Sequence, residues 1–302
     1  MIFLYQTIKY GMKGNIITLT TDWGDSDNYA AILKGHLYCQ SPDLKIVDVT
    51  HRVQKARILD AAFLAKTMYH YYPQNTVHII DVGFISNENL KKYHDTAKAG
   101  LKTDDLPFTH YLAFRYDDHY FLCENNGLIT LFCDVEEITE IVQLLPDVNY
   151  DIFQTFKAIP YYISAATKLS QGKPLHEVGT PYNIDMIQQL KRTVAYVSPM
   201  NKDAIVFTAQ YIDSYENIIT NLHKDLFDAV AKERTFFTVQ SSLLGKKERF
   251  KISQDYLGSS LNETVFLFGH SNYLEIATRH SPLGKILKGG LMSTQFTINF
   301  LD

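Results

Sequence analysis

Short apolar runs alternate with helix-like stretches through the first half of the chain. Ile16 to Thr20 and Ile46 to Thr50 are brief β-rich runs, and the segment from Ser26 to Cys39 between them carries apolar residues at helical spacing. A second helical stretch, from Ala56 to Tyr71, ends before a proline and leads into the apolar run "TVHIID", whose last residue is Asp81. Strands alternating with helices predict βαβ units and a mostly parallel sheet.

The pattern lapses over residues 86–109, which are polar and charged without periodicity. We expect a mobile surface insertion there rather than part of the core. After it we expect a hairpin, two β-rich runs around Asp117 and Asp118, and a helix from Tyr161 to Ser170 that stops at Gly172.

Repeated short β runs separated by polar turns follow Arg192. The runs are "TVAYVS", "AIVFTAQYID", "TFFTVQ", "RFKISQ", "TVFLFG", "YLEIA" and "FTINF". They predict a mostly antiparallel β domain. We therefore expect an N-terminal α/β domain over residues 12–190 and a C-terminal β domain over residues 191–302.

Composition narrows the class of protein. The 302 residues are 46% hydrophobic and carry a formal net charge of -4, so there is no basic excess for nucleic acid. The three cysteines have no CxxC spacing, which favours free thiols in a reducing cytoplasm over disulfides or a zinc site. No apolar stretch reaches the roughly 18 residues of a membrane helix. We expect a cytoplasmic globular protein with neither nucleic acid nor membrane as a partner.

The stretch "TLTTDWGDSDNYAAILKG", residues 18–35, places three aspartates where a predicted strand ends and a predicted helix begins. Open α/β sheets bind ligands in the crevice at such strand ends. Asp25 and Asp27 are in position to cap the helix. Asp22 comes too early to cap and is expected to contact a ligand, and Trp23 beside it either meets that ligand or closes the core.

A metal site is the alternative for these aspartates. Nucleoside hydrolases begin with a similar strand and an aspartate cluster that holds calcium, and hard cations need several converging carboxylate oxygens. In that pattern an aspartate stands where this chain has Thr20. We therefore expect no metal and keep a metal-dependent nucleoside hydrolase as a remote alternative.

Seven fragments spread over the chain resemble one family. They are "ITLTTDWGDSDNYAAILKG", "DVTHRV", "YYPQNTVHIIDVG", "ENNGLIT", "TF" followed by "SAATKLSQG", "YIDSYENIITNL" and "HSNYLEIA". In this order they are similar to the S-adenosyl-L-methionine (SAM) hydroxide adenosyltransferases, the SAM hydrolases related to fluorinase and chlorinase. The resemblance runs from Ile16 to about Leu287.

The resemblance implies a fold and a reaction. It implies a Rossmann-like N-terminal domain with a central sheet, a smaller C-terminal β-barrel, and a homotrimer that binds SAM between the N-terminal domain of one subunit and the C-terminal domain of the next. Water or hydroxide displaces methionine at the ribose C5′, giving adenosine. The leaving group is a neutral thioether that needs no acid, so the reaction requires an aligned water in a dry pocket and no cofactor.

The resemblance also implies roles for single residues. Asp22 matches the aspartate that hydrogen-bonds the ribose hydroxyls, and His51 in "DVTHRV" matches a histidine that lines or supports the crevice. Ser271 matches a serine that binds the methionine carboxylate, and Asn272 stands where relatives carry an arginine.

The "DSYEN" stretch matches a "DxFGN" motif near the methionine amine and the adenine edge. Asp213 and Asn217 are its matching ends. Tyr215 stands for the usual phenylalanine, and Glu216 replaces a glycine that the backbone conformation could require.

The catalytic set departs most from the family pattern. The family carries an Asp, an Arg and a His that orient the water. Asp81 matches the aspartate, but Glu88 stands at the spacing of the arginine and Lys157 at the histidine. We expect Asp81 and Lys157 to be catalytic, with Lys91 or Lys92 of the insertion replacing the arginine. The alternative is a SAM-binding relative that has lost its chemistry.

Overall fold

The computed structural model describes residues 15–147, 156–241, 249–256, 260, 262–278, 283 and 294–301. The chain divides into two compact units, Met1–Lys191 and Arg192–Asp302. The fold class is confirmed: the first unit is α/β with adjacent parallel strands, and the second is a barrel-like β-sheet. No helix in the described ranges is long and apolar enough to cross a membrane.

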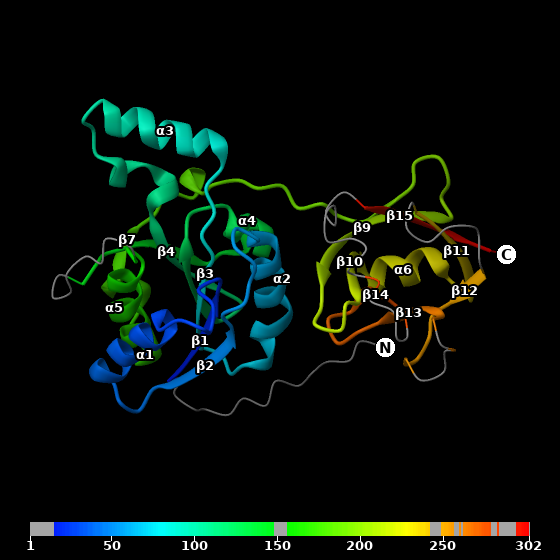
Figure 1. Ribbon diagram of the computed structural model, residues 1–302, viewed down its shortest axis with the longest axis horizontal. Helices are drawn as coiled ribbons and strands as arrows, with labels where there is room; N and C mark the ends of the chain where they lie inside the picture. The colour runs from blue at the N-terminus through cyan, green and yellow to red at the C-terminus, as the bar shows by residue number, and fades with distance from the viewer. Residues whose placement is uncertain are drawn as a thin grey trace. The chain divides into compact units, whose positions relative to one another are not determined.

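A seven-stranded sheet forms the centre of the first unit (Figure 1). Its strand order is β2-β1-β3-β5-β4-β6-β7. The pairings among β2, β1, β3 and β5 are parallel, and those of β4, β6 and β7 are antiparallel. The strands are β1 (Ile16–Thr21), β2 (Lys45–Thr50), β3 (Val77–Asp81), β4 (Tyr111–Tyr116), β5 (His119–Glu124), β6 (Glu140–Leu144) and β7 (Gly179–Pro181).

Helices cover both faces of this sheet, with α1 (Tyr29–Gln40) and α5 (Ile159–Ser170) on one side and α2 (Ile58–Met68) and α4 (Leu128–Phe132) on the other (Figure 1). Successive strand residues point to opposite faces, so Ile79 joins the core under α1 and α5. Ile80 joins the core under α2 and α4. Burial on both faces explains why these strands read as nearly unbroken apolar runs. Short 3₁₀ helices lie at Tyr69–Tyr71, Val135–Glu137, Leu175–Glu177 and Ile184–Met186.

The predicted strands and helices of this unit are present, with boundaries shifted by a few residues. The predicted hairpin is β4 and β5, and its turn residues Asp117 and Asp118 both have positive φ, at 47° and 59°. The sequence pattern did not indicate β6 and β7.

The insertion contains a regular helix, α3 (Asn87–Lys98), although its sequence lacks an apolar period. Ser86 caps it by accepting a hydrogen bond from the Asn89 amide at 3.1 Å. The helix buries no residue. Two 3₁₀ turns follow, Thr103–Asp105 and Pro107–Thr109, and Phe108 is buried. The segment is therefore anchored at its end, and its mobility stays a prediction.

The second unit is an eight-stranded antiparallel sheet in the order β12-β11-β15-β9-β10-β14-β13, with β8 paired to β9. Ile252, just after β12, forms a bridge to Phe266 of β13, so the two edges of the sheet meet. Strand β10 and the helix α6 were not predicted. The elements are β8 (Tyr196–Val197), β9 (Ala204–Ile212), β10 (Ile218–His223), α6 (Lys224–Ala231), β11 (Phe236–Gln240), β12 (Arg249–Lys251), β13 (Thr264–Phe268), β14 (Tyr273–Thr278) and β15 (Gln295–Phe300).

Two histidines of the first unit are buried side by side. Thr18 Oγ1 lies 2.7 Å from His78 Nδ1, and His78 Nε2 lies 3.1 Å from His119 Nδ1. Burial lowers the pKa of His78 to about 3 and that of His119 to about 4. Both rings are therefore neutral in the folded protein at neutral pH.

The free energy of unfolding should fall as the pH drops below about 6.5. Unfolded histidines bind a proton near that pH, whereas these two resist it until about pH 4. Each of the two histidines should lower the free energy of unfolding by up to about 2 kcal/mol between pH 6.5 and pH 5. Urea titrations at both pH values should show a smaller loss in His119→Gln than in the wild type, and an equal loss would contradict this assignment.

Candidate functional site

Three carboxyl side chains stand at one edge of the parallel part of the sheet. Asp22 follows β1, Asp81 ends β3 and Glu124 ends β5, and these three strands are neighbours. Register places Asp81 opposite Thr21 and Ile80 opposite Cys123. The Asp22 amide donates to the Asp81 carbonyl at 3.3 Å. The crevice expected at the strand ends therefore gathers acidic groups from three strands.

Two aromatic side chains hold the carboxylate of Asp81. The Tyr162 hydroxyl donates to Oδ1 at 3.0 Å, and the Trp23 indole Nε1 donates to Oδ2 at 2.8 Å. Burial, together with the charge of Asp22, raises the pKa of Asp81 to about 6, and the two hydrogen bonds oppose that rise. Asp81 is thus a fixed carboxyl group that titrates just below neutral pH.

Asp22 is buried, with 8% of its surface exposed. Burial raises its pKa, while the charge of Lys55 and the backbone amides of Gly83 and Ala56 lower it. Those amides come from the loops after β3 and before α2. The carboxylate therefore has backbone donors from two loops, and its contact with a ligand stays a prediction.

Glu124 ends β5 and was not indicated as a site residue by the sequence pattern. The Asn126 side-chain amide donates to Glu124 Oε2 at 3.1 Å and to the Val82 carbonyl at 3.0 Å. Burial raises the pKa of Glu124 to about 8, and the charges of Asp81 and Asp22 add to that rise. The sequence does contain an indication of this residue, because Glu124 ends the apolar run "HYFLCE" in the same way that Asp81 ends the apolar run "TVHIID".

Trp23 packs in the core in addition to donating a hydrogen bond to Asp81. Its ring packs edge-on against Phe156 with 4.9 Å between centroids, and Phe156 stacks on Tyr29 at 4.6 Å. Only 5% of Trp23 is exposed. The core interpretation of Trp23 therefore fits these contacts, and a contact with ligand stays a prediction.

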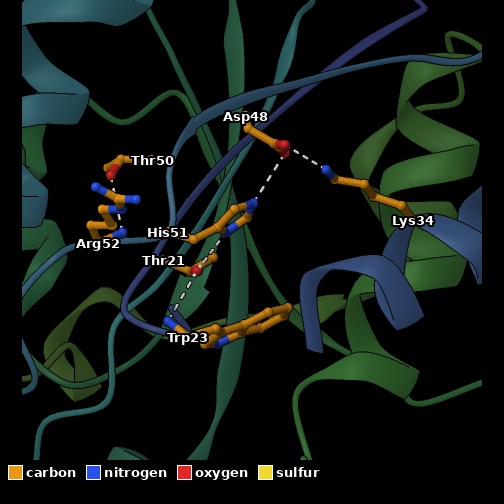
Figure 2. A network of polar contacts seen from close by, with 7 residues as sticks. All are labelled: Thr21, Trp23, Lys34, Asp48, Thr50, His51 and Arg52. Carbon is orange, nitrogen blue, oxygen red and sulfur yellow. Dashed lines mark hydrogen bonds and ion pairs between the residues drawn. The ribbon is translucent and has the colours of Figure 1, made fainter. Parts of the chain in front are cut away.

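His51 braces the strand end that carries Asp22 (Figure 2). Its Nδ1 lies 2.8 Å from Thr21 Oγ1, and its Nε2 lies 3.0 Å from Asp48 Oδ1. The other oxygen of Asp48, Oδ2, pairs with Lys34. The His51 carbonyl accepts from the Gly24 amide at 2.7 Å. These bonds give His51 a supporting position beside the crevice.

The predicted capping roles of Asp25 and Asp27 are both wrong. Helix α1 starts after Asn28, which makes no side-chain capping bond. Asp25 instead accepts from Arg52 Nε at 2.6 Å, and this hydrogen bond lowers the pKa of the exposed carboxyl. An ion pair across the loop has replaced the local cap.

A cavity of about 600 Å³ lies in the first unit. Its wall includes Ala56 and Gly83, whose amides face Asp22, together with Glu124. Lys157 also lines it and pairs with Asp104 of the insertion at 3.9 Å. The insertion residues on the wall are Tyr93, Asp104, Phe108 and Thr109, and neither Lys91 nor Lys92 is among them.

In the second unit, Asp213 and Asn217 build the turn between β9 and β10. Asp213 Oδ1 accepts from the amides of Tyr215 at 2.9 Å and Asn217 at 2.8 Å, and Oδ2 accepts from Asn217 Nδ2 at 3.0 Å. Glu216 adopts φ 64°, so it takes the left-handed conformation in which a glycine is usual. Tyr215 at the tip is 85% exposed.

Ser271 and Asn272 lie at the other end of β10. Strand β14 runs antiparallel to β10, and the Lys224 amide, just after β10, donates to the Asn272 carbonyl at 2.8 Å. About 17 Å of strand separates this turn from Asn217. A single ligand would have to extend along β14 to contact both turns.

Metal-binding geometry is not present in the described part of the chain, where no group of three or more His, Cys, Asp or Glu side chains could hold an ion. None of the described cysteines forms a disulfide: Cys39 is exposed, and Cys123 and Cys133 are buried.

Comparison with known proteins identifies both units. A family model for the SAM hydroxide adenosyltransferase N-terminal domain matches residues 17–91 and 106–179, and one for the C-terminal domain of the same family matches residues 207–293. The unmatched residues 92–105 fall within the insertion.

Similar proteins are curated enzymes and solved structures. An (R)-S-adenosyl-L-methionine hydrolase of Methanocaldococcus jannaschii is 25% identical over 70% of this chain and 68% of its own. A fluorinase of Actinopolyspora mzabensis is 24% identical over 70% and 72%. The fold is shared with an uncharacterised protein of Thermotoga maritima, at 19% identity and TM-score 0.74 over 93% of this chain and 99% of that one. With both domain models matched, the chain belongs to the SAM hydroxide adenosyltransferase family.

Proposed function

We propose that this protein hydrolyses SAM, with water displacing methionine at the ribose C5′ to give adenosine and methionine. The observation that carries the proposal is the placement of Asp22 and Asp81 at the ends of neighbouring parallel strands. The residues whose backbone amides face Asp22, Ala56 and Gly83, lie on the wall of a cavity of about 600 Å³. The family of the chain and its hydrolase relative support the same reaction.

Asp22 is the proposed ribose ligand. Two carboxylate oxygens match the two hydroxyls of a ribose diol, and burial strengthens such charge-assisted hydrogen bonds. Asp81, held by Trp23 and Tyr162, is proposed to orient the attacking water. No acid is needed for the leaving group, because a sulfonium departs as a neutral thioether.

Lys157 is proposed to add a positive charge to the cavity in place of the family histidine. Its partner is Asp104 of the insertion, so the lysine acts as part of an ion pair. A lysine is a point charge rather than a planar fork, and it orients a water less strictly than the missing arginine would. His51 and Trp23 are proposed to support the crevice.

The second unit is proposed to complete the site. Asp213, Tyr215 and Asn217 at one turn, with Ser271 and Asn272 at the other, would contact the adenine and methionine ends of an extended SAM. We infer a homotrimer in which these residues come from a neighbouring subunit, as the family resemblance implies. A cytoplasmic location stays a prediction.

The first test is incubation with SAM followed by chromatography for adenosine and methionine. Asp22→Asn should raise KM and the SAM dissociation constant about 10- to 100-fold, because it removes a charged acceptor. Asp25→Asn is the matched control, since Asp25 is 52% exposed and pairs with Arg52, and it should change neither constant.

Other outcomes separate the alternatives. SAM binding by calorimetry that depends on Asp22, without any product, would identify a binding relative that has lost its chemistry. Nucleoside cleavage that stops on chelation would identify the metal-dependent alternative. Neither binding nor product would contradict the proposal.

A shared site can be tested by complementation. Asp22→Asn and Ser271→Trp, which fills the proposed methionine subsite, should each be nearly inactive when assayed at a SAM concentration below the wild-type KM. Coexpressed, they should recover up to about a quarter of wild-type activity if each site combines two subunits, because a quarter of the mixed sites carry neither change. No recovery, together with a monomeric mass by light scattering, would contradict the trimer.

A further inference from the structure

We propose that Glu124 accepts the proton of the attacking water, an inference that rests on the function proposed above. Glu124 is a site residue that the family motifs did not single out, and its role follows from its place on the sheet and on the cavity wall.

The strand order puts Glu124 beside the proposed water site. Strand β5 is the parallel neighbour of β3, and Ile80 pairs with Cys123. The next residue of each strand, Asp81 and Glu124, therefore lies at the same level of the sheet. Both side chains leave the sheet at its carboxyl edge. The two carboxyl groups therefore lie side by side at the ends of adjacent strands, with Glu124 on the cavity wall, a position in which one can hold a water while the other receives its proton.

The hydrogen bonds of Asp81 and Glu124 indicate which of them holds the water and which receives its proton. Both oxygens of Asp81 already accept donors, from Tyr162 and Trp23. Glu124 accepts one side-chain hydrogen bond among the described residues, from Asn126 to Oε2. The side chain lines the cavity, so its remaining capacity is directed toward the space where a substrate would lie. Asp81 is the fixed carboxylate, and Glu124 is the one with a free oxygen.

The charges around Glu124 set its proton affinity. Asp81 at the end of β3 and Asp22 just after β1 face Glu124 with their charges. Tyr111 of β4 and Tyr162 of α5 also interact with it. The other titratable groups around the cavity include His110, Asp104 and Lys157. Burial and the two aspartates raise the pKa of Glu124 to about 8. A general base works best when its pKa lies near the operating pH, whereas Asp81, at about 6, would bind a proton more weakly.

The step balances without any other reactant. The water oxygen forms a bond to C5′, and the C5′–S bond breaks with its electron pair going to sulfur, which becomes the neutral thioether of methionine. The water proton passes to the Glu124 carboxylate and from there to solvent. One cation and one water thus give adenosine, methionine and a proton.

The experiment is the pH dependence of kcat/KM for SAM in the wild type, Glu124→Gln and Glu124→Asp. The wild type should rise with pH through an apparent pKa near 8. Glu124→Gln should lose about 100-fold in kcat with SAM binding changed less than about threefold, and should keep only a rise near pH 6 from Asp81. Glu124→Asp should keep more of the rate than Glu124→Gln does, and its rate should rise with pH through an apparent pKa that differs from that of the wild type.

The matched control is Glu140→Gln, an exposed glutamate of β6 outside the cavity wall, which should leave the profile unchanged. A wild-type profile that rises only near pH 6, or a Glu124→Gln enzyme with the wild-type rate, would overturn the role of Glu124 while leaving SAM hydrolysis intact. A wild type that forms no adenosine at any pH would overturn both. The wild-type profile needs no variant, so the proposal is decided even if Glu124→Gln does not fold.

Discussion

The hydrogen bonds from Trp23 and Tyr162 to Asp81 are the interaction on which the site depends. A carboxylate at the end of a strand buried on both faces loses most of its hydration, and it is stable there only with donors in fixed positions. The two donors come from different parts of the fold: Trp23 follows β1, and Tyr162 lies on α5. The fold of the first unit must therefore be complete before the carboxylate is held.

Parallel strands create a second constraint, because they bring every strand end to one edge. Asp22, Asp81 and Glu124 are carboxyl groups at that edge. Burial is the larger cause of the raised pKa values of Asp81 and Glu124; the charge of Asp22 adds to the rise in Asp81, and the charges of both aspartates add to the rise in Glu124. Proton binding relieves this repulsion. With a pKa of about 6, Asp81 is mostly ionised at neutral pH, whereas Glu124, with a pKa of about 8, gains its charge and its capacity to accept a proton as the pH rises toward 8. This is a physical consequence of strand order rather than of any one motif.

Much of this arrangement could be predicted from the sequence. Apolar runs and helical periods located β1, β2, β3 and the helices around them, and the residue just after each run indicated Asp22 and Asp81. The place of Glu124 depends on β5 lying beside β3, which is a tertiary pairing that no local pattern contains. The same limit applies to Asp25, whose side chain pairs with Arg52, distant in sequence, instead of capping its own helix.

The insertion shows how a polar segment can belong to a site. Residues 92–105 lie outside the family model, yet Tyr93 and Asp104 stand on the cavity wall and Asp104 pairs with Lys157. Without Asp104, Lys157 would present an unpaired charge to the cavity. Because the replacement and its partner come from separate segments, the wall has to be considered as one electrostatic unit, in which a change at Lys157 alters the charge that Asp104 presents to a ligand.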